Sequence, residues 1–569
     1  MLSVLRMTAA AVRADAGIMN SSAVTVVEYL LRRLASLGVR HLFGVPGDYN
    51  LAMLDTVLAH PDIEWVGTAN ELGAAYAADG YARTVGFGAL LTTFGVGELS
   101  AINGVAGSYA EYVPLVHVTV GPAEAAEHRG AVVHHTAGDG DYDRFARAHE
   151  QVTCAQAVLR RDNAAAEIDR VLTAAVREKR PCYLRLPSDV ASALVGPPTG
   201  SLPDSSDVDE GSLAAFTDVA HDRLATATTV TVLADFLVDR FQARDELAEL
   251  LAAGGFPYAT LSMGKTVVGE GNPQFLGVYS GAFSDPHTRV AVDEADLLIR
   301  AGVLLADTTS GGFSQGFDVE SGIDLGPQTA TVDGKRFDRV PLAAALAALT
   351  ELVHGRETAS PVVTPPEVPR GDGPLTQDQL WDIVASAVRP TTTMLAEQGT
   401  SFFGVCTRRF PDGARFIGQP LWGSIGYTLP ALLGAQLADT SRRCMLLIGD
   451  GSAQQTIQEL GTIARHKLTP VILLVNNNGY TVERAIHGER ACYNDIATWD
   501  WPAVPAALGA KDALTLQART ANELREALAE AERVTDRLVF IEAHTGMDDV
   551  PELLGRIAEG VQVRNSGGR

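Results

Sequence analysis

The stretch from Gly449 to Glu483 reads GDGSAQQTIQELGTIARHKLTPVILLVNNNGYTVE and decides the fold. An apolar run, Cys444–Ile448, precedes it, and a second one, Val471–Val475, follows a segment with helical spacing of its apolar residues. Two buried strands joined through a helix are typical of a parallel α/β sheet. The polar clusters GDGS and NNNG therefore lie at the carboxyl ends of two strands, where open α/β sheets bind ligands.

The side chains of these two clusters suit a metal ion and a diphosphate. Asp450 and Asn477 offer hard oxygen ligands, and Mg²⁺ usually completes such a shell with phosphate oxygens and water. Gly449 and Gly451 let the backbone approach an anion, and Ser452 starts a helix whose amino end favours negative charge. GDGS alone is explained as well by an ordinary strand-to-helix turn. The second cluster makes a shared ligand site the better explanation.

Together the two clusters resemble the magnesium–diphosphate motif of thiamine-diphosphate enzymes. That resemblance implies that Asp450, Asn477 and the carbonyl group of Gly479 hold Mg²⁺. It also implies an α/β fold of three doubly wound domains with mostly parallel sheets. We expect a pyrimidine-binding domain at 21–196, a middle domain at 212–355 and a diphosphate-binding domain at 375–556.

Composition agrees with a large globular protein. A chain of 569 residues is too long for one core and suggests three domains. The formal charge of −24 and the absence of a basic run in the sequence predict no nucleic-acid and no membrane partner. Five scattered cysteines without a CxxC pair predict a reducing, cytoplasmic location. Residues 1–20 are interrupted by arginines, so we expect a disordered extension there and not a signal peptide.

A helix rich in small residues begins at Glu71, within NELGAAYAADGYAR. The helix dipole is a sufficient general reason for a carboxylate at this position. The segment also resembles the one that carries the cofactor-activating glutamate of the family. By that resemblance the Glu71 carboxyl group hydrogen-bonds N1′ of the aminopyrimidine ring and favours the tautomer that removes the cofactor's C2 proton.

The adjacent residues His134 and His135, in VVHHTAGDGD, cannot share one face of a strand, so the sequence predicts a loop. A surface pair is the usual explanation, and a metal site would need a third ligand. With Asp48 in GVPGDYN and Glu483 in GYTVE, the pair resembles the catalytic set of the pyruvate decarboxylase group. That resemblance implies that these four residues surround the reacting carbon and relay a proton.

The segment GVGELS, Gly95–Ser100, follows a predicted strand and contains part of a dinucleotide-binding fingerprint. Ser100 stands where the third glycine belongs, and no acidic residue closes a convincing βαβ unit. We therefore reject a nicotinamide site.

Two further segments, EQGTSFFG (397–404) and QPLWGSIGYT (419–428), resemble the branched-chain 2-keto acid and indolepyruvate decarboxylases. The resemblance implies that Ile425 wedges between the two cofactor rings and that the carbonyl group of Gly423 accepts the 4′-amino hydrogen. The residues expected to bind the cofactor are Glu71, Thr400, Gly423, Ser424, Ile425, Gly449, Asp450, Gly451, Ser452, Asn477 and Gly479.

The family resemblance covers roughly residues 21–554 and implies non-oxidative decarboxylation of a small 2-oxo acid to an aldehyde and CO₂. Val482 stands where pyruvate-specific relatives usually carry isoleucine, which favours branched-chain and aromatic substrates. The residues expected to line the substrate pocket are Gln398, Phe402, Phe403, Val482 and Ser284.

Two alternatives stay open on the same scaffold. An acetolactate-synthase-like carboligase would bind FAD, but such enzymes generally lack the adjacent histidines and the glutamate of GYTVE. A catalytically dead scaffold would have lost members of the catalytic set, which is complete here. In the family Glu71 and Asp450 come from different chains, so we expect a homodimer as the minimal active unit and a homotetramer as the assembly. The middle segment lacks cysteine, so we expect no thiol-based activation by substrate.

Overall fold

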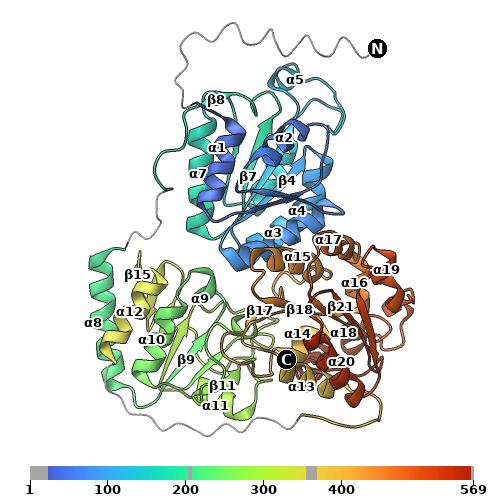
Figure 1. Cartoon of the computed structure of the whole chain (residues 1–569). Helices are drawn as coiled ribbons and strands as arrows, with labels where there is room; N and C mark the ends of the chain where they lie inside the picture. Colours follow the sequence, from blue (N-terminus) through green and yellow to red (C-terminus); the bar gives the residue numbers. More distant parts are fainter. Residues whose placement is uncertain (1–22, 203–207, 354–367, 566–569) are drawn as a thin grey trace.

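The computed structural model describes residues 23–202, 208–353 and 368–565. They form three α/β units, each built on its own central sheet (Figure 1). The predicted amino-terminal extension, residues 1–20, lies outside the described residues. Within the described ranges no helix is both long and apolar enough to cross a membrane.

The first unit contains a six-stranded parallel sheet in the order β3-β2-β4-β5-β7-β6. Alternate side chains of β4 face opposite sides, so Ala89 and Leu91 pack in one apolar cluster and Leu90 in another. Helices α1, α2 and α7 contribute to the first cluster, and α3 and α4 contribute to the second. The elements are β2 (His41–Gly44), β3 (Glu64–Gly67), β4 (Gly88–Thr93), β5 (Leu115–Gly121), β6 (Ala155–Val158), β7 (Cys182–Pro187), α1 (Val26–Ser36), α2 (Leu51–Ala59), α3 (Glu71–Val85), α4 (Val96–Ala110) and α7 (Ala164–Glu178).

The middle unit has a seven-stranded sheet that is parallel through its first five strands and antiparallel at one end. The last two strands are joined by Asp333 and Gly334, both with positive φ. Two such residues make the tight hairpin turn that suits the twist of antiparallel strands. The strands, in sheet order, are β11 (Phe275–Val278), β10 (Tyr258–Thr260), β9 (Val230–Ala234), β12 (Leu297–Ala301), β13 (Ile323–Leu325), β14 (Thr329–Val332) and β15 (Lys335–Asp338).

The third unit contains a six-stranded parallel sheet, and its two central strands are those predicted from the sequence. β18 (Arg443–Gly449) and β19 (Val471–Asn476) are neighbours, with Gly449 opposite Val475. The helical segment between them is divided into α16 (Asp450–Thr456) and α17 (Glu459–Arg465), where the sequence predicted one helix. The remaining strands are β16 (Thr392–Ala396), β17 (Arg415–Ile417), β20 (Leu514–Ala518) and β21 (Val539–His544), and the order is β17-β16-β18-β19-β21-β20.

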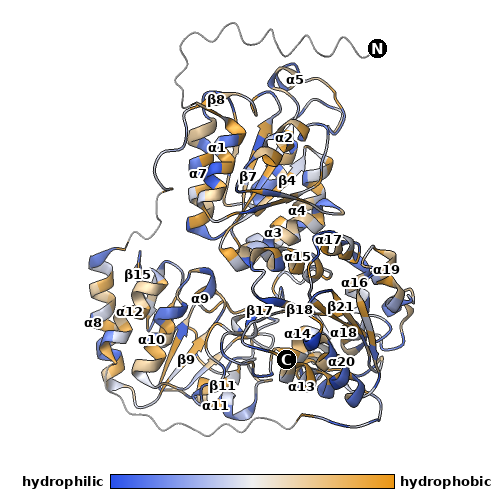
Figure 2. Ribbon diagram, viewed as in Figure 1, coloured by the Kyte–Doolittle hydropathy of each residue, from blue (hydrophilic) through white to orange (hydrophobic). Residues whose placement is uncertain are grey.

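The first unit rests on the third through α3 and α15 (Thr428–Ala438), which lie against each other in Figure 1. Glycines allow this close approach, because a Cβ on Gly80 would collide with the backbone of Ala431 and one on Gly434 with the backbone of Ala77. Hydrophobic residues follow the strands of all three sheets and the contacting helices (Figure 2).

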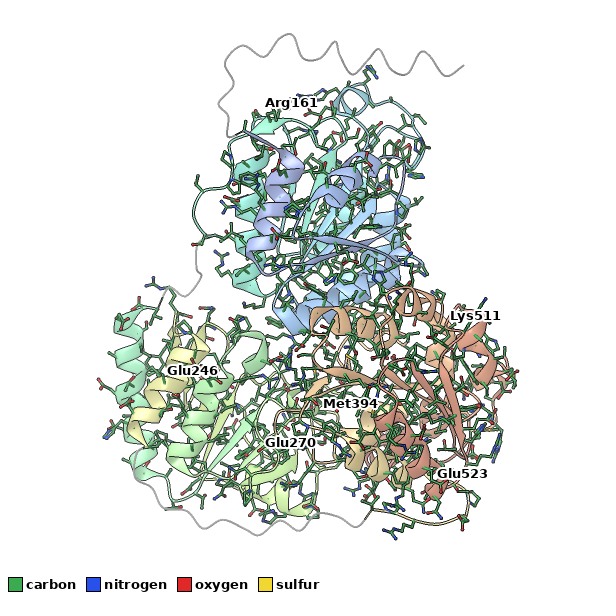
Figure 3. The ribbon with its side chains drawn as sticks, viewed as in Figure 1. Arg161, Glu246, Glu270, Met394, Lys511 and Glu523 are labelled. Atoms are coloured by element: carbon green, nitrogen blue, oxygen red, sulfur yellow. The ribbon has the colours of Figure 1, made fainter. Side chains whose placement is uncertain are left out.

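The middle unit is fastened to the third by Glu270, which Figure 3 labels between the two units. Its Oε2 accepts a hydrogen bond from the backbone N–H of Phe410 at 2.8 Å. The Nζ of Lys265 lies 2.9 Å from the same oxygen, so the buried carboxylate is paired.

Candidate active site

A cavity of 540 Å³ lies at the carboxyl ends of three adjacent strands, β16, β18 and β19. The segments that follow these strands, 397–401, 449–452 and 477–483, supply half of the residues that line it. Phe283 and Thr308 of the middle unit and residues of α21 (Glu552–Asn565) close it on the other side. Its volume is typical of pockets for cofactors and small ligands.

Three oxygen-bearing groups converge at one end of this cavity. A terminal atom of the Asn477 amide lies 3.0 Å from the carbonyl oxygen of Gly479 and 3.1 Å from Oδ1 of Asp450. If this atom is the nitrogen, it donates to both oxygens. If it is the oxygen, three acceptors face one another and require a cation. Adjacent ligands of an Mg²⁺ octahedron with bonds near 2.1 Å lie about 3.0 Å apart. The three residues therefore fit Mg²⁺.

Backbone N–H groups of the protein hold the Asp450 side chain in place without a metal ion. Its carboxylate is buried and accepts hydrogen bonds from the N–H of Gly451 at 2.8 Å and of Gly479 at 3.2 Å. Burial raises the pKa of Asp450 to about 6, and these N–H groups oppose the shift by favouring the ionised form. A divalent cation would favour the ionised form further.

Most of the predicted cofactor residues line this cavity. Ile425 is 37% exposed there, as a side chain that supports a ligand must be. The hydroxyl group of Ser424 is directed elsewhere, because it lies 2.6 Å from the hydroxyl of Tyr76 and accepts a hydrogen bond from Asn103 at 3.0 Å. The lining set comprises Thr400, Gly423, Ile425, Gly449, Asp450, Gly451, Ser452, Asn477 and Gly479.

The predicted substrate pocket is placed in part. Gln398, Phe403 and Val482 line the cavity. Phe402 does not: it precedes Phe403 in α14 (Thr400–Val405), and its side chain is fully buried in the core, with its ring 5.7 Å from that of Phe403 in a T-shaped contact. Ser284 does not line it either, since its hydroxyl group binds the backbone N–H of Ser280 and is buried. Phe402 and Ser284 are therefore not on the lining of this cavity, and their part in a substrate pocket stays a prediction.

Glu397 is a cavity residue that the sequence reasoning missed. Its buried carboxyl group accepts hydrogen bonds from the backbone N–H of Gly426 and of Thr428, both at 3.2 Å, and from the Thr428 hydroxyl. Burial raises the pKa of Glu397 to about 7. The carboxyl group thus ties the loop after β16 to the turn that carries Ile425. An acidic residue directly after the apolar run TTMLA was the available signal.

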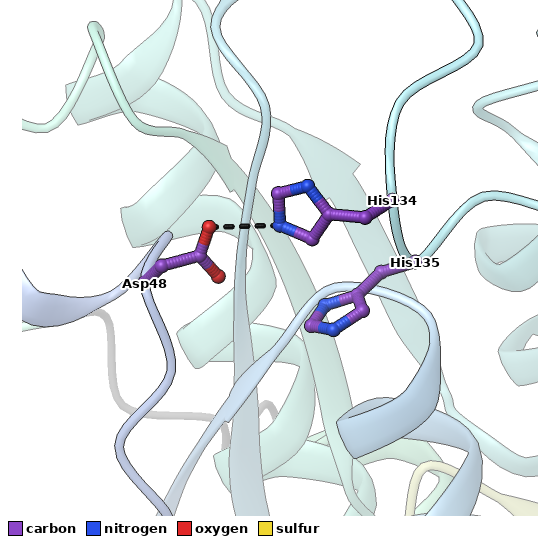
Figure 4. Close-up of side chains that lie close together, drawn as sticks. All are labelled: Asp48, His134 and His135. Carbon is purple, nitrogen blue, oxygen red and sulfur yellow. Dashed lines mark hydrogen bonds and ion pairs between the residues drawn. The ribbon is translucent and has the colours of Figure 1, made fainter.

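A second group of predicted catalytic residues lies on the first unit (Figure 4). His134 and His135 are in a loop, as predicted, and the Nε2 of His134 lies 2.8 Å from Oδ2 of Asp48. The two imidazole rings are 4.7 Å apart between centroids. Tyr49 stacks on the His134 ring at 4.7 Å, with an interplanar angle of 4°. One atom from each of Asp48, His134 and His135 lies within 4.8 Å of the others.

Glu71 is the first residue of α3 and belongs to the same unit. Asn70 precedes it as the helix cap and accepts a hydrogen bond from the N–H of Gly73 at 2.7 Å. The carboxylate of Glu71 faces the start of α4, where a Cβ on Gly97 would lie 3.2 Å from its Oε1.

One chain therefore presents two half-sites. The first is the cavity with the three groups that fit Mg²⁺, and Glu483 is on its wall. The second half-site carries Asp48, Glu71, His134 and His135, and all four belong to the described residues but not to the lining of the cavity.

Comparison with known proteins gives the family. The chain matches the N-terminal TPP binding domain of thiamine pyrophosphate enzymes over residues 24–141, their central domain over 217–352 and their C-terminal TPP binding domain over 400–543. The alpha-keto-acid decarboxylase of Mycolicibacterium paratuberculosis is 51% identical over 539 residues, 94% of this chain and 96% of that protein. That of Mycobacterium ulcerans is 49% identical over 552 residues, 96% and 97% of the two chains. The chain belongs to the thiamine pyrophosphate enzyme family.

Proposed function

We propose that this protein is a thiamine-diphosphate-dependent carboxy-lyase that converts 2-oxo acids to aldehydes and CO₂ without oxidation. The observation that carries the proposal is the convergence of the Asp450, Asn477 and Gly479 oxygens in a cavity that also presents Glu483. The likeness to proteins named alpha-keto-acid decarboxylases extends over nearly the whole chain and supports the same reaction.

The cofactor and the chain divide the chemistry. When bound, thiamine diphosphate supplies the electron sink that accepts the electron pair left by departing CO₂. Asp450, Asn477 and the carbonyl group of Gly479 would hold Mg²⁺ against the diphosphate. The carboxyl group of Glu71 would hydrogen-bond the pyrimidine ring.

The acids and imidazoles of the two half-sites would donate and accept the protons of the reaction. The carbon that has lost CO₂ must gain a proton before the aldehyde leaves. Glu483 stands on the wall of the cavity, and the carboxylate of Asp48 and the imidazole of His134, 2.8 Å apart, are placed to pass a proton between them. His135 completes the set beside His134.

We propose a homodimer as the minimal active unit, because the half-sites of one chain do not form a single site. Large apolar side chains are exposed beside each of them, as at surfaces that meet another chain. Leu51, Leu99 and Val132 lie near the histidine half-site, and Trp422 and Ile425 lie at the cavity. Assembly of two dimers into a homotetramer is the expected larger form.

The five cysteines support a cytoplasmic location. All are free thiols, and three of them, Cys182, Cys406 and Cys444, are buried. Free thiols persist in a reducing compartment, so we propose the cytoplasm.

The cavity wall supports a preference for branched-chain and aromatic substrates. Val482 and Phe403 give it apolar surface, and a γ-methyl group of Val482 lies 3.5 Å from the Cβ position of Gly399. The smaller valine leaves room where an isoleucine would fill it. One methylene group changes discrimination by about 1–3 kcal/mol, so the preference is expected to be broad.

The test is a side-by-side assay of aldehyde release from pyruvate, 3-methyl-2-oxobutanoate, phenylpyruvate and indolepyruvate, with thiamine diphosphate and Mg²⁺ present. We expect the fastest turnover with the branched and aromatic acids and none with Glu483→Gln. Turnover of pyruvate alone would refute the substrate preference and leave the reaction standing. Formation of acetolactate, together with bound flavin, would place the protein among the carboligases.

A further inference from the structure

We propose that Glu98, a buried carboxylate outside both half-sites, is a positioning residue that fixes the conformation of the loop carrying His134 and His135. The inference rests on the proposed function, because it assigns Glu98 an indirect part in the proton steps.

Glu98 is bonded through both of its carboxylate oxygens. It lies in the first turn of α4 with no exposed surface. Its Oε1 accepts a hydrogen bond from the backbone N–H of Gly95 at 2.8 Å, and its Oε2 accepts one from the hydroxyl of Tyr183 at 2.7 Å. Burying a carboxylate is costly, and these bonds offset the cost only while the Gly95 turn keeps its conformation.

The Gly95 turn lies against the loop that carries His134 and His135. Gly95 has φ +68° and ψ −91°, a conformation that side chains disfavour, and a Cβ there would collide with the carbonyl oxygen of His135. His135 itself has φ +65°, which is uncommon for a residue other than glycine. The unusual backbone conformations of Gly95 and His135 are therefore in contact, and Glu98 holds that of Gly95. Strained residues persist only where the surrounding structure enforces them.

The opposite side of the loop is held by Tyr49. Its ring stacks on His134, and its hydroxyl group donates to the His134 carbonyl oxygen at 3.3 Å. The aromatic cluster of Phe94, Tyr142 and Phe145 supports the loop from beneath. The histidines are thus held between Tyr49, which stacks on the His134 ring, and the Gly95 turn, which lies against the backbone of His135.

The groups around Glu98 are themselves titratable or charged. His149, from α6 (Arg144–His149), places Nδ1 3.8 Å from Oε2, and its ring stacks on Tyr183 at 4.8 Å. His117 of β5 lies 5.0 Å from the His149 ring, and Arg185 of β7 is buried nearby and favours the ionised carboxylate. Burial raises the pKa of Glu98 to about 7, so its charge changes in the range where imidazoles also titrate.

The decisive comparison is between Glu98→Ala and Glu98→Gln. Glutamine keeps an oxygen acceptor for the Gly95 N–H, whereas alanine removes it. We expect Glu98→Ala to lower kcat at least tenfold while the affinity for thiamine diphosphate stays within twofold. Glu98→Gln should keep kcat within about threefold but flatten the part of the pH–kcat profile near pH 7. Tyr183→Phe, a milder change that removes one bond to Glu98, replaces the alanine variant if that variant does not fold.

A second readout does not depend on activity. Arg129 is exposed at the start of the histidine loop, so trypsin cleavage after Arg129 reports the stability of that loop. We expect cleavage to accelerate at least fivefold in Glu98→Ala and to change little in Glu98→Gln. Tyr258→Phe is the matched control for Tyr183→Phe. It also removes a hydrogen bond of a buried tyrosine hydroxyl, from Tyr258 to the carbonyl oxygen of Gly269 at 2.6 Å, but in the middle unit.

Parental kcat and cleavage rate in Glu98→Ala would overturn the proposal. The proposal would also be overturned if Glu98→Ala and Glu98→Gln lost kcat to the same extent and thermal stability to the same extent. Glu98 would then be a purely structural residue. If the parent protein decarboxylates no 2-oxo acid, the proposed function fails, and the cleavage rates still decide whether Glu98 holds the loop.

Discussion

Asp450 accepts a hydrogen bond from the backbone N–H of Gly479 at 3.2 Å, so one proposed metal ligand holds the segment that supplies another. The bond joins the first residue of α16 to the loop after β19. It keeps the carbonyl oxygen of Gly479 directed at the point that the Asp450 and Asn477 side chains also face. The proposed metal site is therefore preorganised by hydrogen bonds within the protein.

Asp450→Ala removes both a proposed ligand and this hydrogen bond. We expect the affinity for thiamine diphosphate with Mg²⁺ to fall by at least about 100-fold and decarboxylation to be lost. Trp422 lines the same cavity, so quenching of tryptophan fluorescence measures the binding. Chelation of Mg²⁺ in the parent should abolish activity, and added Mg²⁺ should restore it. Unchanged binding in Asp450→Ala, with exposed Asp62→Ala as the control, would contradict the metal assignment.

Val482→Ile adds one methylene group to the cavity wall. We expect kcat/KM for phenylpyruvate to fall about tenfold relative to that for pyruvate, because a methylene in an apolar pocket is worth about 1–3 kcal/mol of discrimination. Pyruvate measured on the same variant is the internal control. A parallel fall for both acids would indicate damage to the site, and no change would show that Val482 does not contact the substrate side chain.

The position of the residues proposed to hold the metal and the diphosphate could be predicted, because local patterns determine it. The residues after two apolar strands must lie at one sheet edge, and Asp450 and Asn477 do. Residues whose place depends on packing could not be predicted as well. Phe402 and Phe403 are equally apolar, and only the orientation of α14 decides which one reaches the cavity.

Buried carboxylates were the other residues missed. Glu397 accepts hydrogen bonds from Gly426 and Thr428, which follow about thirty positions later. Glu98, in helix α4, accepts one from Tyr183 on strand β7. Such partners meet only in the folded chain. In the sequence, Glu98 stood out only as part of an incomplete dinucleotide motif.

Asp235 provides a test of pH-dependent stability away from the active site. It follows β9, is fully buried and accepts a hydrogen bond from the N–H of Leu304 at 3.3 Å. Burial raises its pKa to about 8 from an ordinary value of 3.8. The folded protein then binds more protons than the unfolded chain between these values. Its contribution to stability is full below about pH 4 and is lost as the pH rises through 8.

Asp235→Asn cannot ionise and should therefore lose this pH dependence. We expect its free energy of unfolding to match the parent's near pH 4 and to exceed it at pH 9 by on the order of 5 kcal/mol. Denaturant unfolding at several pH values measures the difference between the two proteins. Asp218→Asn, at an exposed position of the same unit, is the control and should show no such difference. A gain that does not vary with pH would refute the assignment of the shift to Asp235.

The two-chain active site can be tested by mixing inactive variants. If Glu71 of one chain serves the cavity of its partner, a dimer of one Glu71→Gln chain and one Asp450→Ala chain has one site with both defects and one with neither. Equal mixing with subunit exchange should then restore about a quarter of the parental activity, because half of the dimers are mixed. Mixing Asp450→Ala with Glu483→Gln is the control. Both residues belong to the cavity half-site of the same chain, so every site in the mixed dimer keeps one defect and no activity should return. Recovery in both mixtures or in neither would exclude the shared arrangement.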